Sequence, residues 1–151
     1  MKKTQNKEAV KIISSTTADF SPADQSAPMA TEQVAAGFPS PADDYLEGQL
    51  DLNEYLVHHP AATFFVRVSG DSMIGAGIHS GDILIVDRSV EPKDKKVVIA
   101  VVDGELTVKR LMRRKGEVVL MPENDKYQPI NIAGDMDLEI WGVVTNVIHP
   151  L

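Results

Sequence analysis

The sequence contains no cysteine among its 151 residues. This absence excludes disulfide bonds, zinc sites with thiolate ligands and cysteine nucleophiles. Histidine is scarce too, because the chain has only His58, His59, His79 and His149. No pair among them has the His-x-x-x-His spacing with which one helix face binds zinc. We therefore expect neither a metal site nor a cofactor.

Long hydrophobic runs are absent as well. No apolar run approaches the roughly 20 residues that a membrane-spanning helix requires. The lysine-rich start of the chain is not followed by an apolar stretch of signal-peptide length. We therefore expect a cytoplasmic protein with no membrane partner.

Positive charge and aromatic side chains are both in short supply. The net charge is −7, which disfavours a protein whose main task is to bind the phosphates of nucleic acids. A basic cluster does lie at residues 109–115, but Tyr127 and Trp141 are the only aromatic residues beyond residue 100. Because no stacking platform for bases is apparent beside it, we interpret the cluster as a solvated flank of a hairpin rather than a nucleic-acid surface.

Composition changes near residue 37. Residues 1–36 hold four lysines and four acidic residues, whereas residues 37–151 hold 11 basic and 18 acidic residues. The first segment is rich in small and polar residues, and its larger apolar residues Val10, Ile12 and Ile13 stand nearly alone. Such a segment buries too little apolar area to offset its ordering entropy. We predict a flexible N-terminal arm over residues 1–36 and one folded domain over residues 37–151.

The pattern after residue 62 is that of short β-strands separated by Gly, Asp and Pro turns. The predicted strands are Thr63–Val68, Ile83–Asp87, Val97–Val102, residues 105–113, residues 116–121 and two apolar runs in residues 138–148, split near Gly142. Asp103-Gly104 predicts a tight hairpin, and Asp51 is placed to cap a short helix over residues 51–57. This pattern predicts a mainly β domain, either a small barrel or a sandwich-like sheet.

Two residues in this pattern have the chemistry of a peptidase. Ser72 follows a glycine-containing turn after the first predicted strand, and Lys109 lies in another strand 37 residues later. A serine hydroxyl is a weak nucleophile and needs a base within hydrogen-bond distance. Lysine is a base only when uncharged, and since free lysine has a pKa of about 10.4, such a base requires an apolar pocket. We interpret Ser72 and Lys109 as a candidate serine–lysine dyad.

Both residues also have ordinary structural interpretations. A serine after Gly-Asp commonly bonds local backbone in a turn, and a lysine in a hairpin is commonly a solvated charge. In its strand, Lys109 shares one face with Glu105, Thr107 and Leu111, so alternation does not establish its burial. The spacing alone leaves these alternatives open.

Residues 33–42 form a candidate cleavage segment. The prolines at positions 39 and 41 favour extended backbone, which a protease cleft can bind as an added strand. Ala36 and Gly37 place small side chains on both sides of one peptide bond, which suits a narrow cleft. Composition alone favours an ordinary linker here.

Several short motifs occur together in a specific order. They are Gly37-Phe-Pro-Ser-Pro-Ala42, Asp51-Leu-Asn53, Ser69-Gly-Asp-Ser-Met73, Gly81-Asp82, Leu84-Ile-Val-Asp87, Val102-Asp-Gly-Glu105 and Thr107-Val-Lys109. Jointly they resemble the UmuD family of self-cleaving accessory proteins of SOS mutagenesis, which is related to the C-terminal domain of LexA-type repressors. The resemblance covers about residues 35–149 and implies a LexA C-terminal-domain-like curved sheet or small barrel.

The resemblance also implies roles for individual residues. Ser72 falls on the family's nucleophile and Lys109 on its general base. The backbone amides of Asp71 and Ser72 fall on the oxyanion hole, and the cleaved bond falls between Ala36 and Gly37. The N-terminal arm is longer than the resemblance leads us to expect.

The same resemblance implies partners. It implies a homodimer, cleavage promoted by a RecA filament on single-stranded DNA, and a shortened form that joins a UmuC-type translesion DNA polymerase. Sequence-specific DNA binding is not expected, because a LexA-type repressor needs a helix-turn-helix for which residues 1–36 lack the length and apolar pattern. Two further alternatives are a signal-peptidase-like protease, which the absent membrane anchor counts against, and a non-catalytic module that binds a polymerase.

Overall fold

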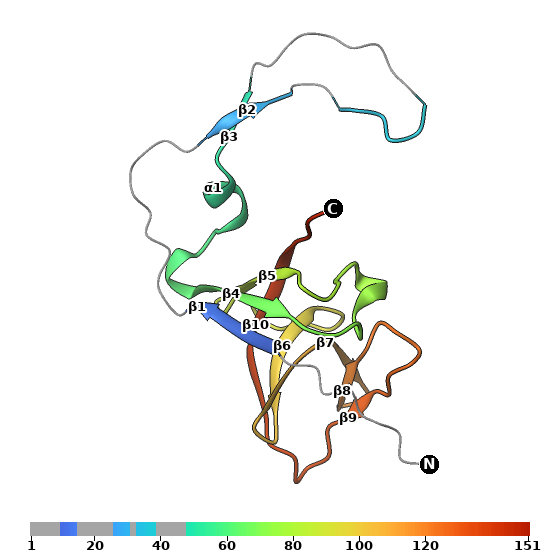
Figure 1. Ribbon diagram of the computed structural model, residues 1–151. Coiled ribbons are helices and arrows are strands. Elements are labelled where there is room, and N and C mark those ends of the chain that lie inside the picture. The colour runs from blue at the N-terminus through green and yellow to red at the C-terminus, as the bar shows by residue number, and fades with distance from the viewer. Residues whose placement is uncertain (1–9, 15–25, 31–32, 39–47) are drawn as a thin grey trace. The chain divides into compact units, whose positions relative to one another are not determined.

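The structure, a computed structural model, describes residues 10–14, 26–30, 33–38 and 48–151 (Figure 1). Contacts between residues divide the chain into two compact units, Met1–Ala18 with His59–Leu151 and Asp19–His58. Much of the arm predicted over residues 1–36 lies outside the described residues, as do residues 39–42 of the candidate cleavage segment. The division of the chain at residue 37 therefore stays a prediction.

Within the described residues, the larger unit has one antiparallel sheet of eight strands in the order β1-β4-β5-β10-β6-β7-β8-β9. The strands are β1 (Val10–Ser14), β4 (Thr63–Val68), β5 (Ile83–Asp87), β6 (Val97–Val102), β7 (Glu105–Arg114), β8 (Glu117–Met121), β9 (Ile130–Asn131) and β10 (Leu138–Ile148). Two 3-10 turns, η1 (Pro60–Ala62) and η2 (Ile74–Ala76), flank β4. β1 also approaches β7, although several strands separate them in the order, so the sheet curls on itself. The predicted mainly β fold is confirmed.

The sequence analysis did not predict β1. This strand runs antiparallel to β4, in a register that pairs Val10 with Val68 and Ile12 with Val66, and Figure 1 shows the two strands side by side. Val10 packs against the buried core of the unit. A short apolar stretch has no partner in its own neighbourhood, but the edge of β4 supplies both backbone hydrogen bonds and apolar surface. The strand is therefore a product of long-range pairing rather than of local pattern.

The smaller unit contains β2 (Ala27–Met29), which pairs antiparallel with β3 (Gly48–Leu50), and the helix α1 (Leu52–Leu56). The predicted cap is confirmed, because the Asp51 carboxylate accepts hydrogen bonds from the Asn53 N–H at 2.9 Å and the Glu54 N–H at 3.3 Å. These bonds satisfy amide groups that have no partner within the first helical turn. Within the described residues, no helix has the length and apolarity needed to cross a membrane.

The predicted hairpin joins β6 to β7. Asp103 has a φ of 48° and Gly104 a φ of 82°, and positive φ at both central positions is the geometry that matches the twist of the flanking strands. The turn fixes the register of the pair, in which Val98 lies opposite Lys109 and Ile99 opposite Val108. A local turn signal thus determines which residues face each other in this part of the core.

β10 is one strand, whereas the sequence predicted two runs split near Gly142. The split is a register shift between Ile140 and Gly142 in the pairing with β6. A side chain at Gly142 would begin 2.7 Å from Cγ1 of Val86, so β10 and β5 approach too closely there for any other residue. A second irregularity lies between Val144 and Asn146, where β10 pairs with β5.

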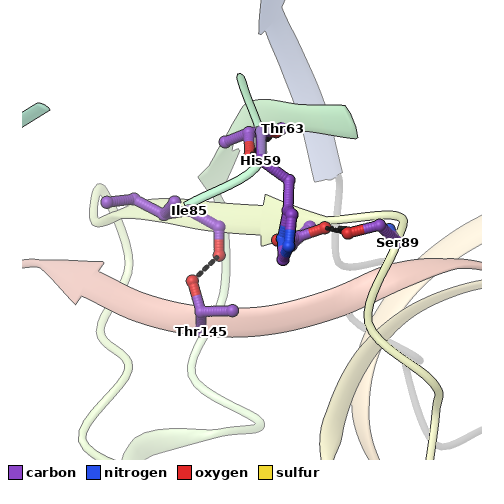
Figure 2. Close-up of polar contacts among 6 residues, drawn as sticks. His59, Thr63, Ile85, Ser89 and Thr145 are labelled. Atoms are coloured by element: carbon purple, nitrogen blue, oxygen red, sulfur yellow. Dashed lines mark hydrogen bonds and ion pairs between the residues drawn. The ribbon is translucent and has the colours of Figure 1, made fainter. Parts of the chain in front are cut away.

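Polar contacts close the ends of β5. Figure 2 shows Thr145 reaching the carbonyl group of Ile85, to which its Oγ1 donates at 3.3 Å. At the end of β5, the Asp87 carboxylate accepts from the N–H and hydroxyl groups of Ser89 at 2.8 and 2.6 Å and lies 2.6 Å from His59 Nδ1. Burial by itself raises the pKa of Asp87, but the bonds from Ser89 and His59 outweigh it, so this pKa lies below its ordinary value.

Two clusters of buried side chains form the core of the larger unit. The first consists of Val66, Val68, Met73, Ile78, Leu84, Val86, Ile99 and Val108. The second consists of Val98, Ala100, Leu111, Leu120 and Val143. The first cluster contains residues on both sides of Ser72 and the neighbour of Lys109, so the core itself holds the two candidate residues.

Candidate active site

Ser72 lies in the turn between β4 and η2, and it is fully buried. The turn begins at Gly70, whose φ of 105° is a conformation that side chains other than glycine rarely adopt. Beyond Ser72, the side chains of Met73 and Ile78 are buried in the first core cluster. The nucleophile candidate is therefore held between a strand end and two apolar anchors, rather than in an exposed turn.

Lys109 lies in β7 and its side chain is buried, with 5% of the residue exposed. Its neighbour Val108, on the other face of the strand, is fully buried. Val98, which lies opposite Lys109 on β6, is fully buried too. β7 is thus covered on both faces at this point because the sheet curls, a feature that alternation along one strand could not reveal. Lys109 is not the solvated charge that its position in a hairpin would suggest.

The structure brings the two side chains together across 37 residues of sequence. Lys109 Nζ lies 3.0 Å from Ser72 Oγ in a buried contact. The same nitrogen lies 2.9 Å from Oγ1 of Thr107 and 3.1 Å from the carbonyl oxygen of Val108. Thr107 stands on the same face of β7 as Lys109, two residues away, so its hydroxyl group helps to orient the amine.

This arrangement accommodates both protonation states of the amine. A charged ammonium group has three N–H donors, which can serve the oxygens of Ser72, Thr107 and Val108. An uncharged amine keeps two N–H donors, for Thr107 and Val108, and turns its lone pair toward the Ser72 hydroxyl group. In that state the serine O–H donates to Nζ, which is the geometry of a nucleophile and its base.

A second segment braces the turn that carries Ser72. The Glu123 N–H donates to the Ser72 carbonyl oxygen at 2.8 Å, and the Gly75 N–H donates to the Glu123 carbonyl oxygen at 2.8 Å. The Glu123 side chain accepts a hydrogen bond from Nε of Arg110, the residue after Lys109. The brace therefore connects the turn of the candidate nucleophile with the strand of the candidate base.

The peptide group between Asp71 and Ser72 is held from the same segment. The Asp71 carbonyl oxygen accepts from Nδ2 of Asn124 at 2.9 Å, and the Asp71 side chain accepts from the Tyr127 hydroxyl group at 2.5 Å. A peptide unit is planar, with its N–H opposite its C=O. Fixing the Asp71 carbonyl group therefore fixes the direction of the Ser72 N–H, which the sequence assigned to the oxyanion hole.

The candidate cleavage bond belongs to the smaller unit. Ala36 and Gly37 are exposed, and so are their neighbours Val34 and Phe38, with 88% and 91% of each residue exposed. In an extended strand, alternate residues point to the same side, so positions 34, 36 and 38 can present their side chains together. The structure brings Ser72 and Lys109 together within the larger unit, while the bond between Ala36 and Gly37 is described in its own unit.

Sequence reasoning missed several residues of this site. Thr107 carried a signal, because alternation placed it on the face of Lys109. Glu123, Asn124 and Tyr127 carried none, because a chain separation of about 50 residues reveals nothing about contact with Asp71 or Ser72. Only the folded sheet brings that segment against the turn.

Comparison with known proteins agrees with this geometry. The family described as Peptidase S24-like matches residues 28–145. The match spans more than half of the chain and includes Ala36, Gly37, Ser72 and Lys109. The chain belongs to the Peptidase S24-like family. The family resemblance predicted from the motifs is confirmed.

Relatives of this Peptidase S24-like chain are similar over most of its length. Protein SamA of Salmonella typhimurium strain LT2 is 50% identical over 128 residues, which cover 85% of this chain and 89% of that protein. Protein MucA of Escherichia coli is 46% identical over 129 residues, or 83% of this chain and 88% of that protein. LexA repressor 1 of Geobacter sulfurreducens is 40% identical over 119 residues, which cover 78% of this chain and 58% of the repressor.

Proposed function

We propose that this Peptidase S24-like protein is a self-cleaving protein of SOS mutagenesis that cuts its own Ala36–Gly37 bond. The observation that carries the proposal is the 3.0 Å contact between Lys109 Nζ and Ser72 Oγ, both of them buried. A buried lysine beside a serine hydroxyl is the pairing that nucleophilic acyl transfer needs. The family membership supports a peptidase, and the exposed small residues at Ala36 and Gly37 support the choice of bond.

The reaction begins with proton transfer. The uncharged amine of Lys109 takes the Ser72 hydroxyl proton, while Ser72 Oγ attacks the carbonyl carbon of Ala36. The negative charge that develops on the Ala36 oxygen is stabilised by the backbone N–H groups of Asp71 and Ser72. Asn124 assists here as a positioning residue, since it fixes the peptide group that carries the Ser72 N–H.

The intermediate then collapses. The bond from the Ala36 carbonyl carbon to the Gly37 nitrogen breaks, and the Lys109 ammonium group returns its proton to the departing amine. Water attacks the ester on Ser72 with Lys109 again as base, which releases the Ala36 carboxyl group and restores the serine. The products are residues 1–36 and residues 37–151.

The cellular part of the proposal follows from the family resemblance. We propose that a RecA filament on single-stranded DNA promotes cleavage without supplying catalytic groups, and that the protein acts as a homodimer. The product, residues 37–151, joins a UmuC-type translesion DNA polymerase as an accessory subunit. This role requires neither a cofactor nor a metal ion in the cleavage reaction.

Mass spectrometry of the purified chain tests the cleavage reaction. Incubation at alkaline pH should yield two fragments that separate between Ala36 and Gly37, at a rate that rises with pH because only the uncharged amine accepts the serine proton. Ser72→Ala and Lys109→Met should each slow cleavage at least about 1,000-fold. A cut at another bond, or an undiminished rate in Ser72→Ala, would refute the residue assignment.

Matched substitutions at exposed positions serve as controls. Ser69→Ala removes a hydroxyl group from an exposed residue of the same turn, and Lys96→Met removes an exposed lysine beside β6. Both variants should cleave at the rate of the unaltered chain. A chain that stays whole with RecA, single-stranded DNA and ATP would instead favour a non-catalytic module that binds a polymerase.

A further inference from the structure

Two histidines and an aspartate meet at the edge of the larger unit, away from the candidate dyad in the sequence. His79 and Asp82 lie in the turn between η2 and β5, and His149 directly follows β10. The antiparallel pairing of β10 with β5 sets Ile148 opposite Ile83. That register brings His149 to the turn, although 70 residues separate it from His79.

The three side chains converge on one carboxylate. His149 Nδ1 lies 2.5 Å from Oδ1 of Asp82, and His79 Nδ1 lies 3.7 Å from Oδ2 of Asp82. The two imidazole rings lie 4.6 Å apart, centre to centre, at an angle of 36°. One potential ligand atom from each residue lies within 4.8 Å of the other two.

Burial differs sharply among the three residues. The Asp82 side chain is 1% exposed, whereas the side chains of His79 and His149 are 51% and 42% exposed. Oδ2 of Asp82 accepts the backbone N–H of His79 at 2.7 Å, which fixes the carboxylate plane. A rigid carboxylate therefore underlies two imidazoles that are open to solvent and can adjust their rings.

We propose that His79, Asp82 and His149 form a binding site for a divalent transition-metal ion of the zinc class. Two imidazole nitrogens and one carboxylate oxygen suit Zn²⁺, with solvent in a fourth position, whereas Mg²⁺ and Ca²⁺ prefer sites made of oxygen atoms alone. Zinc–ligand bonds of about 2.1 Å in a tetrahedron place ligand atoms about 3.4 Å apart. The observed distances of 2.5 and 3.7 Å reach that spacing through shifts of less than about 1 Å in the exposed rings.

The carboxylate is suited to a cation for an electrostatic reason as well. Burial by itself raises the pKa of Asp82, but hydrogen bonds from the His79 N–H and from His149, together with the charges of both histidines, outweigh it. The pKa of Asp82 is therefore lowered, so the group stays ionised beside the two imidazoles. The bond from the His79 N–H is the kind of supporting contact that orients metal ligands.

Metal binding would reach the turn that carries Ser72. The Gly81 N–H donates to the Val68 carbonyl oxygen at 2.8 Å, and the Gly70 N–H donates to Oγ of Ser80 at 3.2 Å. The histidine turn is thus bonded to the backbone just ahead of the candidate nucleophile. A bound ion would tie this turn to the end of β10 and stabilise both. The sequence analysis expected no metal site because it considered only histidines close together in the chain.

Calorimetric titration of the full chain with Zn²⁺ tests the site. The chain should carry Ser72→Ala, so that it stays whole whether or not it cleaves itself, and it should be purified without a histidine tag. We expect one Zn²⁺ per chain and, at about 100 times the dissociation constant, a rise in Tm on the order of 5–10 °C. Mg²⁺ at the same concentration should leave the Tm unchanged. Co²⁺ should give the visible absorption of a four-coordinate site.

Three substitutions separate this site from other zinc-binding groups. His79→Ala and His149→Ala change half-exposed residues and should each weaken Zn²⁺ binding at least about 100-fold, because they remove a direct ligand. His59→Ala is the matched control, since His59 Nδ1 also contacts a buried carboxylate, that of Asp87, at 2.6 Å. It should bind Zn²⁺ as tightly as the parent.

Two results would overturn the proposal. One is the absence of a Zn²⁺-dependent signal in the parent, which would identify a cluster held by hydrogen bonds alone. The other is equal Zn²⁺ affinity in the parent, His79→Ala and His149→Ala. Neither result bears on self-cleavage, because the titration uses a chain that lacks the Ser72 hydroxyl group.

Discussion

Gly75 is the position at which one added methyl group tests how the candidate nucleophile is held. An ideal Cβ at Gly75 would lie 2.7 Å from the carbonyl oxygen of Glu123, which is about 0.7 Å closer than an ordinary contact of 3.4 Å. The obstructing atom belongs to the backbone and cannot rotate away. The same oxygen accepts the Gly75 N–H at 2.8 Å, and the Glu123 N–H donates to Ser72. In Gly75→Ala, the braced segment and the Ser72 turn must therefore move apart.

The expected costs follow from that displacement. Overpacking at a tight site costs about 1–3 kcal/mol, so we expect the free energy of unfolding to fall by about 2 kcal/mol. For a chain of this length, that loss corresponds to a fall in Tm of roughly 4–8 °C. A shift approaching 1 Å in a catalytic group slows reaction up to about 100-fold, and we expect cleavage of Gly75→Ala to slow about 10- to 100-fold.

The assay is a time course of fragment mass at alkaline pH, well below the Tm of the variant, together with thermal unfolding monitored by circular dichroism. Gly134→Ala is the control, because a Cβ there would meet no atom within 4 Å and should change neither rate nor Tm. Unchanged cleavage and Tm in Gly75→Ala would refute the steric argument. A lowered Tm with an unchanged rate would show that the Glu123 brace stabilises the fold but does not position Ser72.

Two further predictions concern single hydrogen-bonding groups. Thr107→Val keeps the shape of the side chain but removes the hydroxyl group 2.9 Å from Lys109 Nζ; cleavage should slow about 10-fold, an effect of about 1.4 kcal/mol, and Thr107→Ser should restore most of the rate in the same mass assay. Asp87 has a lowered pKa in the folded state, so its stabilising contribution is complete above the unfolded-state pKa of about 3.9 and is lost as pH falls through the folded-state value. Urea unfolding between pH 6 and pH 2 should therefore show a smaller loss of stability for Asp87→Asn than for the parent. Equal rates for Thr107→Val and the parent, or equal pH dependence for Asp87→Asn, would contradict these assignments.

Local signals were enough to predict most strands of the larger unit. Alternating apolar residues and an Asp-Gly turn gave the β6–β7 hairpin, and the same turn fixed the register that sets Val98 opposite Lys109. The cap of α1 was equally local, because Asp51 bonds to amides only two and three residues away. These features depend on neighbours in sequence, so a single chain reveals them.

Pairing between distant segments was not predictable in the same way. β1 forms because the edge of β4 is available to it, and the break expected at Gly142 is a bulge where β10 approaches Val86. The segment around Asn124 contacts Asp71 across 53 residues. Such contacts depend on the curl of the whole sheet, which no window of sequence records.

The sequence by itself determined the kind of chemistry available to this protein. Without cysteine, and with motifs around Ser72 and Lys109 in a specific order, it indicated a serine nucleophile with a lysine base and a Peptidase S24-like fold. Only the tertiary structure decided that the lysine is buried on a doubly covered strand, 3.0 Å from the serine oxygen. It also decided that histidines 70 residues apart share one carboxylate. The physical reason is that residue type fixes what a group can do, whereas distance and exposure to water are set by strand pairing across the whole sheet.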